Sequence, residues 1–226
     1  MKKLMLLMLT MILAGILVAC GNDENTSPSN DAEKPKEIPV TKEKDDKKKG
    51  NSYTDGPLTE IGQMAIEEDG TKAELMNIIN VNEKVDMAPI EVAIQSIKLL
   101  QKTDVGEEQL ERIQLFSEKL ISDPVNYVQI IYSAENTIAE DANWTGITHL
   151  ILSNGEQINV VSNNFLGGMD FDSTFYGEVK KDGLLGIPYQ GNPEDIKSVK
   201  IVFGSSVNPE SYREITAEKQ VTYEFD

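Results

Sequence analysis

Alternation of apolar and polar residues is the feature that most constrains how this 226-residue chain can fold. From residue 57 onward, apolar side chains recur at every second position in several short runs, which places them on one face of a β-strand. Such runs lie at 90–94, 125–134, 199–203 and 221–225. In the first run the phase shifts between Ile94 and Ile97, which predicts a β-bulge. The pattern predicts about eight to ten short strands and a mainly β domain.

Three Asx-Gly pairs separate runs of this kind: Asp69-Gly70, Asn154-Gly155 and Asp182-Gly183. A two-residue hairpin loop needs positive φ at both central positions, and Asn or Asp followed by Gly adopts that conformation at the least cost. We therefore predict a hairpin at each of the three pairs.

Residues 104–121 have helical rather than strand periodicity, because apolar side chains recur there at Leu110, Ile113, Phe116 and Leu120. Asp104, followed three positions later by Glu107, resembles a capping box, and Lys119 in the last turn suits the helix dipole. We predict one amphipathic helix in this segment, which ends before Pro124 and covers an open end or edge of the sheets.

The order of these elements resembles the immunoglobulin-like β-sandwich domains of unknown function in secreted lipoproteins of Gram-positive bacteria. It is also similar to the immunoprotective secreted antigen fold of mycobacteria. The stretches that carry the resemblance are 72–82, 90–100, 127–137, 153–157 and 195–203, within residues 57–226. The resemblance implies an immunoglobulin-like antiparallel β-sandwich with one inserted helix, and it supplies no catalytic residues.

The first 19 residues have the character of a secretory signal, because Lys2 and Lys3 precede an apolar stretch at 4–18. That stretch is shorter than the roughly 20 apolar residues of a membrane span. It ends in Leu17-Val18-Ala19-Cys20-Gly21, which resembles the lipobox of bacterial lipoproteins. The resemblance implies cleavage before Cys20, acylation of its thiol, and anchoring to the outer side of a cell membrane, more often that of a Gram-positive cell. An uncleaved N-terminal anchor and an ordinary signal peptide are the alternatives.

Residues 20–56 are rich in Asp, Glu, Lys, Asn, Ser and Pro and contain few large apolar side chains. Such a stretch buries too little apolar surface to offset its ordering entropy, so we predict a disordered, charged linker. Its basic run at 42–49 is either solvated linker or a contact for anionic headgroups. The predicted organisation is a signal peptide at 1–19, lipidated Cys20 and linker at 20–56, and a β-sandwich at 57–226.

Charge and residue counts exclude several classes of function. The net charge of −17 has the wrong sign for binding phosphate backbones, so nucleic acid is not an expected partner. Cys20 is the only cysteine and His149 the only histidine, which leaves no disulfide and no usual zinc ligand set. No Gly-x-Ser-x-Gly elbow accompanies His149. We therefore predict no catalytic residue, no metal and no cofactor.

Two groups of residues remain as candidate binding sites. Asp170 and Asp172 place two carboxylates near Ser and Thr hydroxyls, a set of oxygens that calcium or magnesium can use. Their spacing lacks the Gly and terminal Glu of a calcium loop, so a solvated turn is the simpler interpretation. The second group is aromatic, and its members form either a recognition surface or part of the core: Trp144, Phe165, Phe171, Phe175 and Tyr176.

These features predict a lipid-anchored extracytoplasmic module that binds an unidentified extracellular ligand or envelope protein. The alternative is an accessory subunit of an envelope complex, whose exposed sheet edge pairs with another protein. An enzyme acting on envelope material is the third and weakest interpretation, because the chain offers no paired nucleophile and base.

Overall fold

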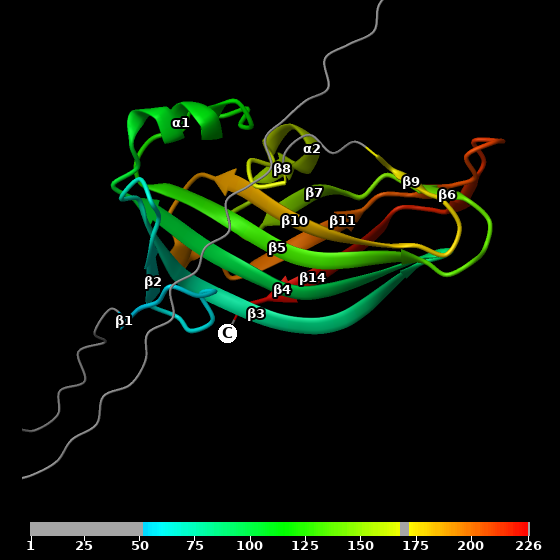
Figure 1. Cartoon of the computed structure of the whole chain (residues 1–226), viewed down its shortest axis with the longest axis horizontal. Coiled ribbons are helices and arrows are strands. Elements are labelled where there is room, and N and C mark those ends of the chain that lie inside the picture. Colours follow the sequence, from blue (N-terminus) through cyan, green and yellow to red (C-terminus); the bar gives the residue numbers. More distant parts are fainter. Residues whose placement is uncertain (1–51, 168–171, 226) are drawn as a thin grey trace, which may run out of the picture. The chain divides into compact units, whose positions relative to one another are not determined.

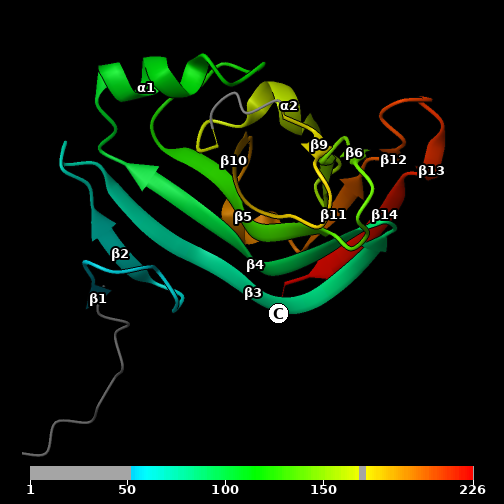
Figure 2. The same cartoon turned by 45° about the vertical axis from the view of Figure 1, so that its right-hand side comes forward.

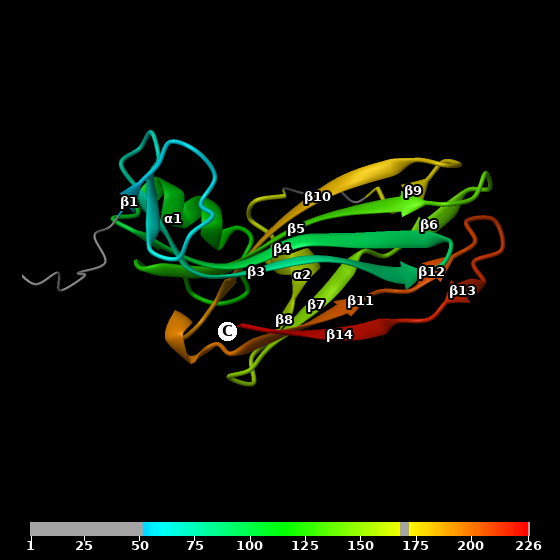
Figure 3. The same ribbon diagram turned by 90° about the horizontal axis from the view of Figure 1, so that it is seen from below.

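Four long antiparallel strands form the first layer of the computed structural model, which describes residues 52–167 and 172–225. Their order is β3 (Lys72–Met87), β4 (Ile90–Thr103), β5 (Val125–Asn136) and β10 (Lys180–Tyr189). Figures 1 and 3 show them side by side. Two short strands, β2 (Gln63–Ile66) and β1 (Ser52–Tyr53), continue this sheet alongside the first residues of β3.

The second layer is a four-stranded antiparallel sheet with shorter strands. Its order is β14 (Lys219–Glu224), β11 (Ser198–Phe203), β7 (Ile147–Leu152) and β8 (Gln157–Asn159). A third, smaller sheet has the order β13 (Glu214–Thr216), β12 (Ser206–Val207), β6 (Ala142–Trp144) and β9 (Thr174–Phe175). The helices are α1 (Glu107–Gln114), α2 (Val160–Asn163) and the 3-10 turn η1 (Pro193–Asp195).

The main core lies between the two larger sheets. Each long strand contributes alternate side chains to it, as period-two patterning requires. From the first sheet these are Val92, Ile94, Ile97, Leu99, Val128, Ile130, Leu185 and Ile187. From the second they are Leu150, Leu152, Val199, Ile201, Phe203 and Tyr223. Two sheets packed over one apolar core make a β-sandwich, which confirms the predicted fold class.

The strand order is that of an immunoglobulin-like sandwich. In that fold strand B lies between A and E in one sheet, and strand F lies between C and G in the other. Here β4, β5 and β10 occupy the places of A, B and E, while β7, β11 and β14 occupy those of C, F and G. β8 lies beside β7 as C′ does beside C, and α1 lies on the connection between β4 and β5.

Two glycines interrupt the second sheet and account for two of the strands beyond the eight to ten predicted. Gly146 separates β6 from β7 with φ of 80°, and Gly204 separates β11 from β12. The Gly204 N–H donates to the Gly146 carbonyl at 2.8 Å. A Cβ on Gly204 would lie 1.9 Å from Thr145 Oγ1, so only glycine fits this crossing. The small sheet is therefore the continuation of these strands beyond the interruption.

Two of the three predicted hairpins are confirmed. Asp69-Gly70 joins β2 to β3, and Asn154-Gly155 joins β7 to β8. Only the glycine of each pair has positive φ, so neither turn has the conformation that was expected, with positive φ at both central positions. The third prediction is wrong, because Asp182 and Gly183 lie inside β10 and pair with β5. A Cβ on Gly183 would lie 2.1 Å from the Tyr132 ring, so close packing explains that glycine. The predicted bulge is confirmed by the register shift between Ile94 and Ser96.

The predicted helix exists but is shorter than residues 104–121. Its N-cap is Gly106, without a side-chain cap, so the expected capping box is wrong. Asp104 has φ of 57° and pairs with Lys72 instead. The helix ends at Gln114, whose side-chain amide donates to the Ser117 and Lys119 carbonyls and stabilises a non-helical turn. Leu120 is 84% exposed rather than part of an apolar helix face.

Among the described residues, strand pairing begins inside the segment that was predicted to be linker. Ser52 and Tyr53 pair in parallel with Gln63 and Met64, ahead of the expected domain start at Pro57. The predicted signal peptide at 1–19 and most of the predicted linker lie outside the described residues.

Candidate ligand-binding cavity

Cys20, the predicted lipidation site, lies outside the described residues. Among the residues that are described, no helix is long and apolar enough to cross a membrane.

His149 lies on β7, half-buried on the face that points away from the core. Its Nδ1 is 3.2 Å from Thr148 Oγ1 on the adjacent residue. The core-facing neighbours in β7 are Ile147 and Leu150, so the histidine is directed away from the space between the sheets.

The predicted aromatic group is divided between different surroundings. Trp144 and Phe175 are buried in the main core, whereas Tyr176 is 67% exposed. Phe165 packs edge-on against Tyr127, with ring centroids 5.1 Å apart, near α1. Phe171 lies outside the described residues. The core interpretation therefore holds for two members, and the five do not form one surface among the residues described.

A cavity of about 300 Å³ opens between β10 of the first sheet and β6, β7 and β9 of the second layer. Trp144, Phe175 and Tyr132 provide its aromatic walls. The Trp144 indole N–H donates to the Gly204 carbonyl at 2.9 Å, which fixes the ring in place. Tyr132 packs edge-on against that indole, with centroids 6.2 Å apart. Ala134, Gly146, Gly167 and Gly183 are also part of the lining, and of these three glycines only Gly146 has open space where a Cβ would lie.

The mouth of the cavity carries both apolar and charged side chains. Val161 and Leu184 are exposed there, at 58% and 41%. Lys181 Nζ lies 4.8 Å from the Phe175 ring centroid and 3.0 Å from Asp172 Oδ2. Hydrogen bonds from Lys181 and from the Thr174 N–H hold the pKa of the Asp172 carboxyl below its ordinary value. An apolar interior with a few polar groups at its mouth is typical of small-molecule sites.

The predicted carboxylate pair does not supply a cation site within the described part of the chain. Asp170 lies outside it, and Asp172 is engaged by Lys181. No group of three or more His, Cys, Asp or Glu side chains suitable for a metal ion occurs among the described residues.

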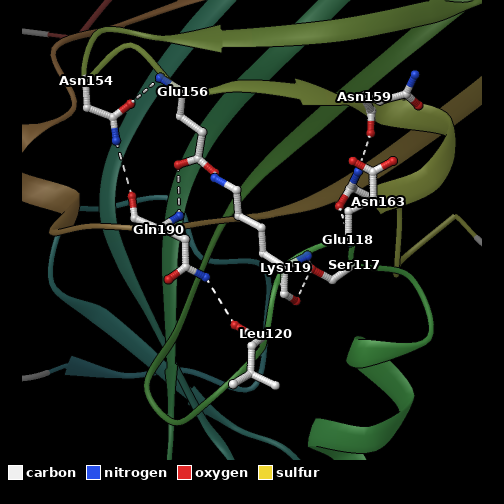
Figure 4. Close-up of polar contacts among 9 residues, drawn as sticks. All are labelled: Ser117, Glu118, Lys119, Leu120, Asn154, Glu156, Asn159, Asn163 and Gln190. Carbon is white, nitrogen blue, oxygen red and sulfur yellow. Dashed lines mark hydrogen bonds and ion pairs between the residues drawn. The ribbon is translucent and has the colours of Figure 1, made fainter.

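A polar junction, which the sequence did not predict, closes the opposite end of the sandwich (Figure 4). The Glu156 carboxylate, only 9% exposed, accepts from Lys119 Nζ at 2.5 Å and from the Gln190 N–H at 3.0 Å. The Glu118 N–H donates to Asn163 Oδ1, and Gln190 Nε2 donates to the Leu120 carbonyl. These bonds attach the segment after α1 to the β7–β8 turn and to α2. The bonded residues are 34 to 70 positions apart in the sequence, so no local motif predicts these contacts.

A second buried polar cluster, also unpredicted, holds α1 itself. Lys102, buried on the outer face of the first sheet, donates to Glu67 Oε1 at 2.6 Å. Gln109 of α1 donates to the other oxygen of Glu67 at 2.8 Å and accepts from Thr71 at 2.6 Å. Every charged or amide group named here has a partner, so the cluster is a structural attachment.

Comparison with known proteins adds no activity. No family model matches the chain, and no curated protein matches it in sequence. The chain is similar to the crystal structure of a functionally unknown protein from Listeria monocytogenes EGD-e, with 14% identity and a TM-score of 0.48. That similarity covers 68% of this chain and 86% of the other. The assignment of the fold therefore rests on the strand order described above.

Proposed function

We propose that this protein is a lipid-anchored extracytoplasmic module that binds a ligand in the cavity between β10 and β6, β7 and β9. The observation that carries the proposal is the cavity itself. A well-packed sandwich interior has few voids larger than a water molecule, whereas this one has an aromatic-walled space of about 300 Å³ with an open mouth. That volume is at the lower limit for small-ligand sites, which favours a compact ligand or one side chain of a larger partner.

The chemistry of the lining favours an apolar ligand group that carries no negative charge. The walls are the faces and edges of Trp144, Phe175 and Tyr132. Of the three charged side chains in the lining, Lys181 is bonded to Asp172, while Asp182 is exposed and makes no hydrogen bond or ion pair with the rest of the described chain. The uncompensated charge at the mouth is therefore negative, which disfavours anionic ligands.

A neutral fluorescent probe, N-phenyl-1-naphthylamine, tests the cavity directly. Trp144 is the only tryptophan, so energy transfer from its indole to a bound probe reports occupancy of this site. We expect saturable transfer in the full chain carrying Cys20→Ala. Ala134→Leu, which fills the cavity from the inner face of β5, should weaken binding at least tenfold. Ala93→Leu is the matched control, because Ala93 lies on the outer face of the neighbouring strand.

Two results would contradict a binding cavity. One is the absence of saturable transfer in the unsubstituted cavity, and the other is equal binding by the Ala134→Leu and Ala93→Leu variants. Thermal unfolding of both variants separates loss of the cavity from loss of the fold.

The anchoring part of the proposal rests on the lipobox around Cys20. Acylation by two chains gives stable membrane attachment, whereas a single chain does not. Cys20→Ala should move the protein from the membrane fraction to the soluble fraction or leave it unprocessed, with the domain still folded. Membrane retention of a processed variant would refute anchoring through this residue.

An accessory subunit remains the second candidate, because β3 has an open edge. β2 pairs with β3 only at Lys72–Glu74, and the rest of that edge, as far as Met87, has no paired strand among the described residues. Two bulges and several charged side chains along this stretch oppose pairing with another strand, which makes this the weaker candidate. Co-purification of one protein in fixed stoichiometry from solubilised membranes would favour it.

A further inference from the structure

The polar cluster that holds α1 brings a primary amine and a primary amide onto one carboxylate. Glu67 Oε1 accepts from Lys102 Nζ at 2.6 Å, and Glu67 Oε2 accepts from Gln109 Nε2 at 2.8 Å. Lys102 belongs to β4 and Gln109 to α1, so the two nitrogen atoms come from different elements. Exchange of one amide nitrogen for another requires these groups: a nucleophilic amine, an amide, and a carboxylate that carries protons between them.

Burial suits the Lys102 amine to act as the nucleophile. Lys102 is only 4% exposed, and its Nζ lies 5.9 Å from the centroid of the Phe165 ring. An ammonium and a carboxylate in direct contact can pass one proton along their hydrogen bond, which leaves a neutral amine and removes the cost of a buried charge. The neutral amine has the lone pair that attack on a carbonyl carbon needs.

The Gln109 amide is polarised by a third side chain. Thr71 Oγ1 donates to Gln109 Oε1 at 2.6 Å. A donor at this position stabilises the negative charge that develops on a carbonyl oxygen when a nucleophile attacks the carbon. Thr71 is fully buried, and its N–H donates to Asp69 Oδ1 at 3.0 Å, so the β2–β3 turn holds its hydroxyl in place.

An open cleft gives the amide nitrogen a route to solvent. The cleft, of about 540 Å³, is lined by Glu67, Asp69, Gln109 and Arg112 among others, and Lys102 is not part of its lining. The buried amine and the solvent-side amide nitrogen are thus both bonded to Glu67, and a small leaving group can depart without crossing the core.

We propose that Lys102 and Gln109 join in an isopeptide bond, which links β4 covalently to α1. Lys102 Nζ first gives a proton to Glu67 and then attacks Gln109 Cδ, which forms the new C–N bond. Glu67 passes its proton to Gln109 Nε2, and the Cδ–Nε2 bond breaks. The second Nζ proton follows as ammonia leaves, so the by-product is ammonium and Glu67 is again a carboxylate. The reaction needs no oxidant, reductant or other reactant.

This bond would supply a covalent constraint that the chain otherwise lacks. Cys20 is the only cysteine, so no disulfide forms within the chain. α1 has eight residues, of which only Ile113 is buried, and an isolated helix of that length is not stable in water. A bond from Gln109 to the first sheet would keep this helix attached when the surrounding polar contacts open.

Tryptic peptide mapping by mass spectrometry, on the full chain carrying Cys20→Ala, tests the bond. Trypsin cleaves after lysine and arginine, and Lys98, Lys102 and Arg112 are consecutive cleavage sites. An isopeptide bond blocks cleavage at Lys102, so we expect an uncut peptide, 99–112, that is lighter by one ammonia. Its fragmentation should place a closed loop between residues 102 and 109. Loss of ammonia from Asn154-Gly155 would appear in a different peptide.

Glu67→Gln tests the role of the carboxylate. The variant retains the amine and the amide but has no group to carry the protons, so the yield of the uncut peptide should fall at least about tenfold. Glu91→Gln is the matched control, because Glu91 forms the same kind of pair with Lys84 near the other end of β4. Its yield should equal that of the unsubstituted chain, and circular dichroism shows whether both variants fold.

Three results would overturn the proposal. Complete cleavage at Lys102 with the Gln109 amide intact in the unsubstituted chain would do so, whether or not the variants fold. Cleavage at Lys102 with the Gln109 amide hydrolysed would show that water is the nucleophile. Equal yields of the uncut peptide from the folded Glu67→Gln and Glu91→Gln variants would exclude Glu67 from the reaction. None of these results depends on ligand binding in the cavity.

Discussion

The two ends of the sandwich differ in what covers them. At the helix end, α1 and the segment after it cover the sheets, and the Glu156 and Glu67 carboxylates are bonded to lysines. At the cavity end, β6, β9 and β12 are only two or three residues long, and glycines and alanine line an open space. Figure 2 shows α1 and the short strands toward opposite ends of the long strands.

The difference shows what closing a sandwich end requires. The helix end is closed by segments distant in sequence, and each buried charge there needs a partner because desolvation penalises an unpaired one. The cavity end lacks such a cover among the described residues and is bounded instead by backbone and aromatic rings. An open space with aromatic walls is typical of a small-molecule site, and the proposed function is therefore assigned to the cavity end.

The largest expected effect is that of Gly183→Ala at the cavity end. The new Cβ would lie only 2.1 Å from the Tyr132 ring, so the ring must move, and overpacking of this kind costs up to about 3 kcal/mol of unfolding free energy. Urea unfolding measures the change. Gly56→Ala is the matched control, since its Cβ would have only an ordinary contact with Thr54. A loss of unfolding free energy below about 1 kcal/mol would mean that the Tyr132 ring can move aside at little cost.

A smaller loss is expected at the helix end for Glu156→Ala. The substitution leaves the Gln190 N–H without its acceptor and releases Lys119, which costs about 2 kcal/mol. Amide hydrogen exchange at Gln190 should accelerate together with the loss of stability. Glu210→Ala is the control, because that side chain is exposed. If exchange at Gln190 stays slow, the junction does not hold this end closed.

The smallest effect is a gain, for Tyr189→Phe in β10. The Tyr189 hydroxyl is buried and finds no hydrogen-bond partner among the described residues. Removing an unsatisfied hydroxyl stabilises a protein by about 1 kcal/mol at neutral pH. Tyr212→Phe, at an exposed position, should leave the unfolding free energy unchanged. Destabilisation by Tyr189→Phe would show that the hydroxyl does have a partner.

The effect of Tyr189→Phe on the free energy of unfolding depends on pH. Burial raises the pKa of Tyr127 and Tyr189, and raises that of Tyr223 to about 12, from an ordinary value of 10.0. Stability is therefore fully present below pH 10 and is lost as the pH rises through the folded-state pKa values. Tyr189→Phe should reduce this alkaline loss, as measured by urea unfolding between pH 9 and pH 11.

Patterns local in sequence predicted the fold, while contacts between distant residues were not predictable. The alternation at β4, β5, β11 and β14 and two Asx-Gly turns predicted a mainly β domain, and the resemblance in the order of the elements implied the sandwich. The hairpin predicted at the third Asx-Gly pair was wrong. Gly183 is a glycine because the Tyr132 ring of the neighbouring strand packs against it, and a local sequence pattern does not contain that contact. The helix was predicted too long, since its apolar spacing continued past Gln114, where side-chain bonds to the backbone favour a turn.

The candidate site was only partly predictable. Composition drew attention to Trp144 and Phe175 as unusual aromatic residues, and the structure places both on one cavity. The rest of the cavity depends on which strands pair and in which register, and residue type does not predict this. Tyr132 reaches it through the register of β5, which places its ring against Gly183 of β10.

The parallel pair of β1 and β2 has a mechanical consequence. If Cys20 is held in a membrane, tension on the chain enters the domain at Ser52, the first residue of a strand only two residues long. That strand carries no residue of the main core, so a modest force would peel it away while the sandwich stays folded. The released residues would lengthen the connection between the anchor and the domain. Detachment of β1 would therefore limit the force that reaches the cavity.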